Sequence, residues 1–364
     1  FCPDQAVTRA QMASFLVRAF QLPPAPEPVS LLPPPIDDGV AWDRILHVST
    51  GGSPSGDGTS GSPFAPVQQA LAAATPGTQI LVAPGSYGPF RIDGVTGAPG
   101  RPIGVFANGA VTIDAGGSGA IPIAGSDPSY VVIDGFQLTG ATIHGMNIDD
   151  GGSYDTPAHH LVLRNLTIAA AGSGGNNDCI KLSGVDDFWV LGSDVSGCNR
   201  GEIIDMVGSH RGVISGNHFH DTVGNGVQTK GGSSDTIIHG NRFERIPGRA
   251  VNAGGSTGSQ FLRPAGVAHE AANITIVGNL FVQNGDNSGA AVAFVGCDAC
   301  TFANNTIIEP QTWVARILQE TVGLTPSRDG RFVNNLIVLR TAHLRTFVNV
   351  GPDTLSLIHI GRCR

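Results

Sequence analysis

The chain has 364 residues and a net charge of −8, and only 14% of its residues are charged. This balance argues against a general role in binding nucleic acid or an anionic membrane surface, because both need a basic face. No apolar run reaches the ~18 residues of a membrane helix, so no membrane span is predicted. With 51 glycines, 24 prolines and 41% apolar residues, the composition favours an all-β protein of many short strands.

The first residues predict a small helical fragment followed by a linker. Thr8 can cap a helix whose apolar residues recur at helical spacing as far as Phe20. Residues 7–13 (VTRAQMA) and 15–19 (FLVRA) resemble the closing half of an S-layer homology motif, which implies binding to a cell-wall polymer if the motif is complete. We therefore assign residues 1–23 to a partial S-layer homology motif and residues 24–41 to a stiff Pro-rich linker. Because residue 1 is Phe, we expect the native N-terminus to be missing.

The next segment predicts the capped end of a solenoid. After a strand and a Gly/Ser-rich loop, a short helix is expected at residues 67–74, followed by a strand that ends at Tyr87. Such a helix would cover the core and the strand edges that an open solenoid end exposes. The segment resembles the N-terminal cap of pectin-lyase-like β-helices, a group that includes chondroitinase B and alginate lyases.

Repeats of about 24 residues then carry an Asn or Ser at one fixed place, which predicts stacked coils. The marked residues are Asn165, Ser193, Asn217, Asn241, Asn279, Asn305 and Asn335. We expect a ladder of hydrogen bonds along them. Core columns are expected three residues before the mark, at Val162, Val190, Ile214, Ile238, Ile276, Phe302 and Phe332, and two residues after it, at Val195, Phe219, Phe243, Phe281, Ile307 and Ile337.

These repeats predict a single-stranded right-handed parallel β-helix over residues 42–354. Residues 355–364 (LSLIHIGRCR) break the pattern and are interpreted as a non-native tail derived from a sequencing adapter. Cys297 and Cys300 predict either a turn disulfide or two buried thiols, and not a zinc site. Cys179 lies on an apolar strand and is expected in the core.

A candidate site emerges where three coils align without gaps, beginning at Asp178, Glu202 and Gly226. Alternation along the strands predicts one outward row of Lys181, Asp205, Thr229 and Asn252, with a second row of Asp178, Glu202 and Arg249 beside it. Strict register would bury Lys230. We expect an irregularity of one residue near residues 225–226 to turn Lys230 outward, and a local departure from a good pattern is where function is expected.

The chemistry expected of this set is β-elimination beside the carboxylate of a uronate sugar. That carboxylate must be neutralised by an Arg or by calcium, and a base such as a Lys of depressed pKa must be in reach. The segment QTKGGS around Lys230 resembles the one that bears the catalytic Lys in chondroitinase B and alginate lyases, although their Arg-His-Gly is replaced here by residues 252–254 (NAG).

This resemblance implies a polysaccharide lyase with one role for each candidate residue. Lys230 would be the base and Arg249 the neutralising group. The remaining candidates are Asp178, Glu202 and Asp205 as calcium or sugar ligands, and Lys181, Asn252 and Arg263 as substrate-binding residues. The protein is expected to be secreted or at the cell surface, with an acidic polysaccharide as its partner.

Two alternatives remain open. Residues 177–180 (NDCI) resemble a segment of polygalacturonases, which implies inverting hydrolysis by Asp178 with Glu202 or Asp205 at a carboxylate spacing of about 6.5–9.5 Å. A non-catalytic β-helix that binds glycan or serves in adhesion is the other alternative. Residues 256–270 are expected to form either a wall of the cleft or a structural flap. An outward stripe with His218 and His220 is expected to form cross-coil ion pairs.

Overall fold

The computed structural model describes residues 32–117, 119–153, 155–173, 175–199, 201–286, 288–339, 344–352, 354 and 358–360. The chain divides into residues 1–33 and residues 34–364, and the second unit is described below. The predicted S-layer homology motif and most of the predicted linker therefore lie outside the described residues. Within the described part, no helix is long and apolar enough to cross a membrane.

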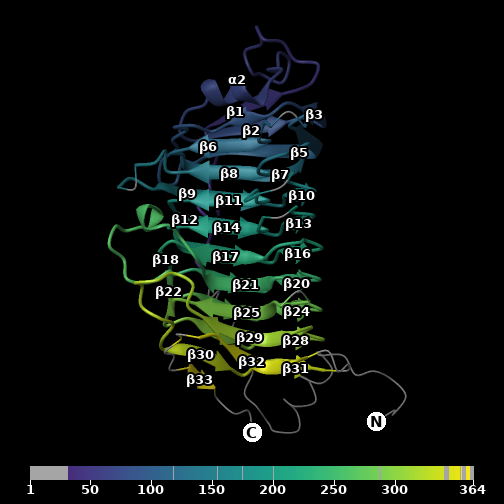
Figure 1. Ribbon diagram of the computed structural model, residues 1–364. Coiled ribbons are helices and arrows are strands. Elements are labelled where there is room, and N and C mark those ends of the chain that lie inside the picture. The colour runs from purple at the N-terminus through teal and green to yellow at the C-terminus, as the bar shows by residue number, and fades with distance from the viewer. Residues whose placement is uncertain are drawn as a thin grey trace, which may run out of the picture. The chain divides into compact units, whose positions relative to one another are not determined.

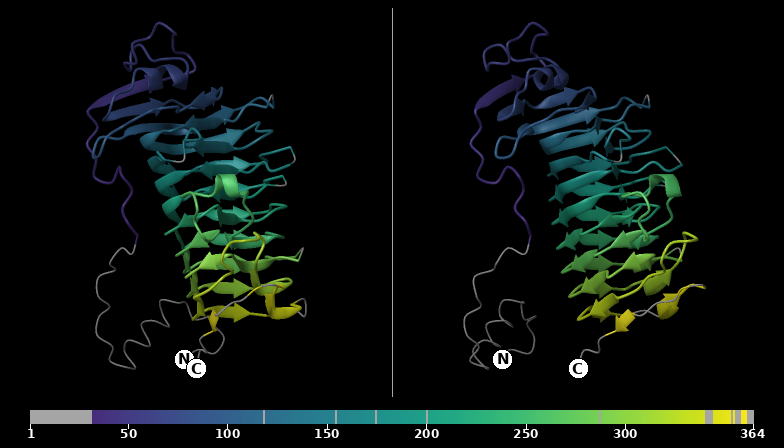
Figure 2. Two further views of the ribbon diagram at one scale, coloured as in Figure 1. Left: turned by 60° about the vertical axis from the view of Figure 1, so that its left-hand side comes forward. Right: turned by 90° about the vertical axis from the view of Figure 1, so that its left-hand side faces the viewer.

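The described residues from 34 onward form a right-handed solenoid of parallel strands (Figures 1 and 2). Each full coil contributes one strand to a ten-stranded sheet and then one to three strands to a 23-stranded sheet. One coil runs through β11 (Ile180–Ser183), β12 (Val185–Leu191) and β13 (Asp194–Ser196) before the chain enters β14 (Ile204–Val207) one coil further on. The predicted parallel β-helix is confirmed.

Three rows of strands make up three faces of the solenoid. The ten-stranded face consists of β4 (Phe90–Arg91), β6 (Ile123–Ser126), β8 (Met146–Asp149), β11, β14, β17 (Val227–Lys230), β21 (Arg249–Gly254), β25 (Ala290–Val295), β29 (Trp313–Leu318) and β32 (Thr346–Val350). The second face consists of β1 (Arg44–Val48), β2 (Thr78–Val82), β5 (Ile103–Asp114), β7 (Ser129–Thr139), β9 (Ala158–Arg164), β12, β15 (His210–Ser215), β18 (Ser233–Ser234), β19 (Ile237–His239), β22 (Ala271–Ala272), β23 (Thr275–Val277), β26 (Cys297–Asp298), β27 (Thr301–Ala303), β30 (Gly330–Val333) and β33 (Ile358–Ile360). The third face consists of β3 (Gly85–Tyr87), the ends of β5 and β7, β10 (Thr167–Ala169), β13, β16 (His218–His220), β20 (Arg242–Glu244), β24 (Leu280–Val282), β28 (Thr306–Ile308) and β31 (Leu336–Val338).

The ends of the solenoid differ. Helix α2 (Val67–Ala72) lies over β1 and buries Val67, Ala70 and Leu71, so the predicted cap is present and ends two residues earlier than expected. At the other end, β33 pairs with β30 through residues assigned from the sequence to a non-native tail. The origin of that tail stays a prediction.

The core columns follow the predicted register from coil to coil. Val190 pairs with Ile214, and the same column continues through Ile238, Ile276, Phe302 and Phe332. Phe219, Phe243 and Phe281 stand in register in the second column, with ring centroids 5.3 and 4.8 Å apart. Apolar neighbours above and below each of these side chains therefore build one continuous core.

The Asn ladder is also present, with one correction. The backbone N–H of Asn217 donates to Oδ1 of Asn241 at 3.0 Å, and the same bond recurs at each later step. Asn165, however, is one residue out of place. It occupies the turn position with φ of 53°, where Gly192 stands in the next coil, and the buried Leu166 takes the ladder position by donating to Ser193. Val162 accordingly pairs with Trp189, outside the main core, and not with Val190.

Candidate functional site

A cleft of about 650 Å³ lies on the ten-stranded face. Its floor includes Lys181 and Lys230, and the segment between β21 and β22 supplies one wall through Ser256, Thr257 and Phe261. This segment contains the short helix η1 (Ser259–Phe261), which stands away from the coils in Figure 2. The inserted loop therefore lines a cleft, which confirms one of its two expected roles.

Two buried side chains fix this loop to the coils. Glu270 accepts hydrogen bonds from the backbone N–H of Gly231 at 2.9 Å and from the hydroxyl of Thr257 at 2.8 Å. Arg263 donates to Asp186 and to the carbonyl of Gly208, each at 2.8 Å. Arg263 lines the cleft but is only 7% exposed, because its guanidinium binds these internal acceptors. We therefore assign Arg263 to anchoring the loop, in place of the substrate contact expected from the sequence.

The register changes by one residue in the coil that contains Lys230. Asp205 pairs with Gln228, so Gln228 and not Thr229 belongs to the outward row, and Thr229 is fully buried in the core column with Met206. The expected position of Thr229 is thus wrong. The expected irregularity before Lys230 is present, and it turns Lys230 into the cleft.

Asp205 holds both lysines of the site. Its fully buried carboxylate contacts Nζ of Lys181, and its Oδ1 lies 3.1 Å from Nζ of Lys230. These are the only two lysines in the entire sequence, since the other 19 basic residues are arginines. Burial by itself would lower the pKa of Lys230, but the carboxylates of Asp205 and Glu202 outweigh burial and raise it. The site therefore concentrates the chain's titratable ammonium groups at the floor of one cleft.

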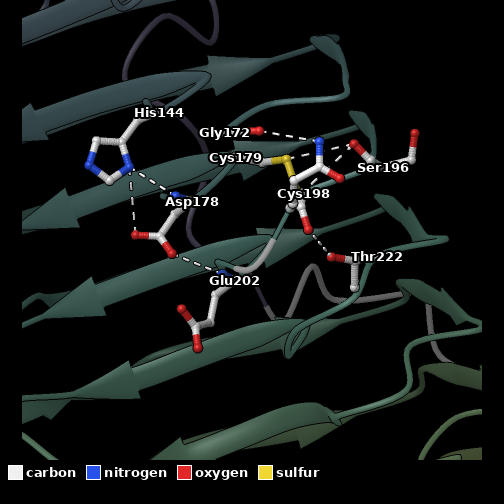
Figure 3. The surroundings of a disulfide bond; sticks show 9 residues. His144, Gly172, Asp178, Cys179, Ser196, Cys198, Glu202 and Thr222 are labelled. Atoms are coloured by element: carbon white, nitrogen blue, oxygen red, sulfur yellow. Dashed lines mark hydrogen bonds and ion pairs between the residues drawn. A yellow bond between two sulfur atoms is a disulfide. The ribbon is translucent and has the colours of Figure 1, made fainter. Parts of the chain in front are cut away.

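A second row of side chains includes Asp178 and Glu202, which Figure 3 shows with His144; Asp178 lies 3.7 Å from Nζ of Lys181. Asp178 is fully buried. Its backbone N–H donates to Nδ1 of His144 at 2.9 Å, and its Oδ1 accepts from the backbone N–H of Glu202 at 2.8 Å. Burial and the charge of Asp205 raise the pKa of Asp178 to about 8, whereas burial lowers the pKa of His144. Both shifts favour the uncharged forms of these two side chains.

His144 was not among the residues expected from the sequence. It lies one coil before Asp178, where Met146 pairs with Ile180 and Asn147 with Lys181. The alternation of Met146 and Ile148 was the available signal, because it matches the inward pattern of the next coil.

A disulfide closes the loop that follows Asp178. Cys179 and Cys198 are bonded, with their Cα atoms 5.4 Å apart (Figure 3). Cys179 is buried as expected, but as half of a disulfide and not as a free core thiol. Cys297 and Cys300 also form a disulfide, which decides between the two alternatives left open for that pair. The Cys179–Cys198 bond restrains the chain directly beside the site.

Arg249 and Asn252 line a second, shallower hollow of about 360 Å³. Arg249 donates to Asn252 at 3.1 Å and binds Glu320 at 2.6 Å. The hollow adjoins the cleft at Ser256, which lines both. The structure thus places Lys230 and Arg249, the two residues predicted to act together, in adjacent hollows.

The predicted calcium ligands do come together. Asp178, Glu202 and Asp205 each offer an oxygen, and these three atoms lie within 4.8 Å of one another. The ammonium of Lys181, however, contacts Asp205 and lies 3.7 Å from Asp178, so positive charge already compensates these carboxylates. A divalent cation would have to compete with Lys181 for the same oxygens.

Comparisons with known proteins bear on the fold. A family model described as "Right handed beta helix region" matches residues 123–307, which is just over half of the chain. No curated protein matches. The chain is similar to an alginate lyase from Paenibacillus sp. str. FPU-7, with 19% identity and a TM-score of 0.58 over 83% of this chain and 99% of that one. It is also similar to a GH136 lacto-N-biosidase from Eubacterium ramulus, with 13% identity and a TM-score of 0.55 over 87% and 68%.

Proposed function

Because the chain belongs to the right-handed β-helix family, we propose that it uses the face of this solenoid to bind an acidic polysaccharide and to cleave it by β-elimination at a uronate residue. The observation that carries this proposal is that the chain's only two lysines converge on one buried carboxylate and both line the cleft. Arginine supplies positive charge as well as lysine does, but it cannot act as a base at physiological pH. The restriction of lysine to this place therefore favours proton transfer.

In the proposed reaction the two lysines have different roles. Lys181, paired with Asp205, neutralises the carboxylate of the uronate, which acidifies the neighbouring C–H. Lys230 removes that proton in its neutral form. The electron pair left on C5 forms the C4–C5 double bond as the C4–O glycosidic bond breaks, and the leaving oxygen takes a proton from the Lys230 ammonium or from water. Since the pKa of Lys230 is raised, only a small fraction is neutral at pH 7, and the rate is expected to increase with pH into the alkaline range.

The adjoining hollow extends the proposed binding surface along the solenoid. Arg249 and Arg316 both line it, and they are suited to bind the carboxylate of a second sugar. Arg249 is therefore proposed to bind a neighbouring unit of the chain and not the sugar that reacts. Among the structural neighbours, one is named an alginate lyase, which agrees with a role for this face in carbohydrate chemistry.

The calcium site that the sequence suggested at Asp178, Glu202 and Asp205 has no part in the proposed steps. Lys181 and Lys230 already contact this carboxylate set. We expect added calcium to leave both the rate and the unfolding temperature unchanged. A calcium-dependent gain in either quantity that is lost in Glu202→Gln would instead place the ion among these residues.

The inverting hydrolase is not supported by the geometry. An inverting pair of carboxylates needs a separation of about 6.5–9.5 Å to admit water, whereas Asp178, Glu202 and Asp205 have oxygens within 4.8 Å. Asp178 and Asp205 are also fully buried, so a sugar cannot reach either of them directly. Lys181 and Lys230 line the cleft, whereas Asp178, Glu202 and Asp205 do not.

We further propose that the protein works outside the cytoplasm, either secreted or at the cell surface. Two disulfides are present among the described residues, and such bonds persist mainly in oxidising compartments. Attachment to a cell-wall polymer through residues 1–23 stays a prediction.

The test compares two conservative variants that separate charge from basicity. The protein is incubated with alginate, pectate and chondroitin, and the ultraviolet absorbance of unsaturated uronate is followed. Lys230→Arg should abolish activity, because arginine keeps the charge but cannot accept the proton. Lys181→Arg should keep a measurable fraction, because neutralisation needs only charge. Circular dichroism of both variants controls for folding.

Three outcomes decide against the proposal. Equal activity of Lys230→Arg and the parent would remove Lys230 as the base. New reducing ends without unsaturation would indicate hydrolysis. Binding of the polysaccharide without any cleavage would indicate a glycan-binding or adhesive β-helix.

A further inference from the structure

A second cluster lies on the third face of the solenoid, away from the cleft. Asp194 on β13 faces His218 and His220, which stand two residues apart on β16 in the next coil. Because alternate residues of a strand point to the same side, both imidazoles lie outside the core, and their rings stack with centroids 4.1 Å apart. The proposed reaction uses none of these three residues.

The nitrogens of both rings converge on one carboxylate. Nδ1 of His218 lies 3.1 Å from Oδ2 of Asp194, and Nε2 of His220 lies 3.2 Å from Oδ1. One ligand atom from each of the three residues falls within 4.8 Å of the other two. Two donors bound to a tetrahedral zinc ion at about 2.0–2.1 Å are about 3.3 Å apart, so these separations match those of ligands around one ion.

The residues behind the histidines fix the orientation of the rings. Nδ1 of His220 lies 2.7 Å from Asp221, which leaves Nε2 directed toward Asp194. Arg245 in turn holds both carboxylate oxygens of Asp221, at 2.6 and 2.7 Å. A histidine that binds a metal generally donates its other ring N–H to a carboxylate, a backbone carbonyl or water, and Asp221 is such a carboxylate. On the far side of His218, Nε2 lies 3.5 Å from Glu244.

From this geometry we propose that Asp194, His218 and His220 form a binding site for a divalent transition-metal ion of the zinc type, linking two successive coils. Imidazole nitrogens with one carboxylate suit such ions better than calcium or magnesium, which prefer oxygen. Asp194 is on the exposed side of the cluster, so a fourth position remains open to water or to a donor group of a ligand. This proposal is independent of the proposed lyase activity.

The experiment titrates zinc chloride into untagged, chelator-treated full-length protein by isothermal calorimetry. We expect one zinc ion per chain. His220→Gln should abolish this binding. Asp221→Asn should weaken it about 10–100-fold without removing a ligand, as loss of a carboxylate behind a metal-binding histidine does elsewhere. His239→Gln serves as the matched control, because His239 is also a half-exposed strand histidine and contacts Ser215 in place of a carboxylate.

Cobalt(II) in place of zinc gives a second readout, since its visible spectrum reports the coordination geometry. Thermal unfolding of each metal-free variant controls for folding. The proposal is overturned if the parent binds no zinc. It is also overturned if His220→Gln keeps the parent's affinity and stoichiometry, which would assign the ion to other histidines such as His159 and His160.

Discussion

Replacement of one Asn in the ladder should destabilise the solenoid far more than its small change in volume suggests. The side chain of Asn241 accepts hydrogen bonds from N and Nδ2 of Asn217 at 3.0 and 2.9 Å, and it donates to the carbonyl of Ile214 at 2.8 Å and to Asn279 at 3.0 Å. Asn241→Ala removes all four bonds from a site that water cannot reach, because Asn241 is 1% exposed. At about 1 kcal/mol each, the expected loss is about 4 kcal/mol in the free energy of unfolding.

Urea unfolding followed by tryptophan fluorescence measures this loss. Asn335→Ala is the matched comparison, because Asn335 is half-buried and makes three such bonds. Because water can replace part of the hydrogen bonding that Asn335→Ala removes, the expected loss in the free energy of unfolding is about 2 kcal/mol. The reasoning fails if the free energy of unfolding of Asn241→Ala lies within about 1 kcal/mol of the parent's, or if both substitutions lower it by the same amount.

Three further outcomes are expected. Cys198→Ser should lower the free energy of unfolding by about 3 kcal/mol, since the disulfide closes a loop with a sequence separation of 19, and the difference between parent and variant in urea unfolding should disappear when both are reduced. Asp178→Asn should become more stable relative to the parent as the pH rises from 3.8 toward 8. The pKa of Asp178 is raised in the folded parent, so the folded parent keeps a proton that the unfolded chain has released, and the parent loses stability over this range. Unfolding temperatures of both proteins measured across this range should diverge, and a constant difference would contradict the prediction. Arg263→Met should speed proteolytic cleavage within residues 256–270 severalfold, because the anchor to Asp186 is lost, and cleavage at the parent's rate would count against that anchor.

The coil register could be predicted because two independent patterns repeat together. Because an apolar column lies on each side of a fixed Asn, a shift of the strand register by one residue would expose both columns. The columns that begin at Val190 and Val195 have the predicted register. The error at Asn165 has a local cause. The turn needs a residue with positive φ directly before the ladder position, and Asn is suited to both places. Only the hydrogen-bond partners distinguish them.

The site was predictable in part. Lys230 attracted attention because strict alternation would have buried it, and it does face the cleft. The same irregularity exchanges Gln228 and Thr229, which the gapless alignment could not show. The ion pair of Arg263 with Asp186 joins residues 77 apart in the sequence, and no repeat spacing indicates it. Long-range pairs made by an inserted loop follow no period, so they become visible only in three dimensions.

The anchored loop has a consequence for how such a chain can change its selectivity. The segment between β21 and β22 leaves the solenoid and returns to it without altering strand register, so its length and sequence can vary while the coils stay intact. The ion pair that holds the loop to the coils, however, needs Asp186, which lies 77 residues before Arg263 in the sequence. Exchange of the loop between related proteins should therefore succeed only when the acceptor carries a carboxylate at that earlier position. One wall of the cleft is then interchangeable, and Asp186 is one scaffold side chain on which this exchange depends, beside the backbone groups of Gly208 and Gly231 that also bind the loop.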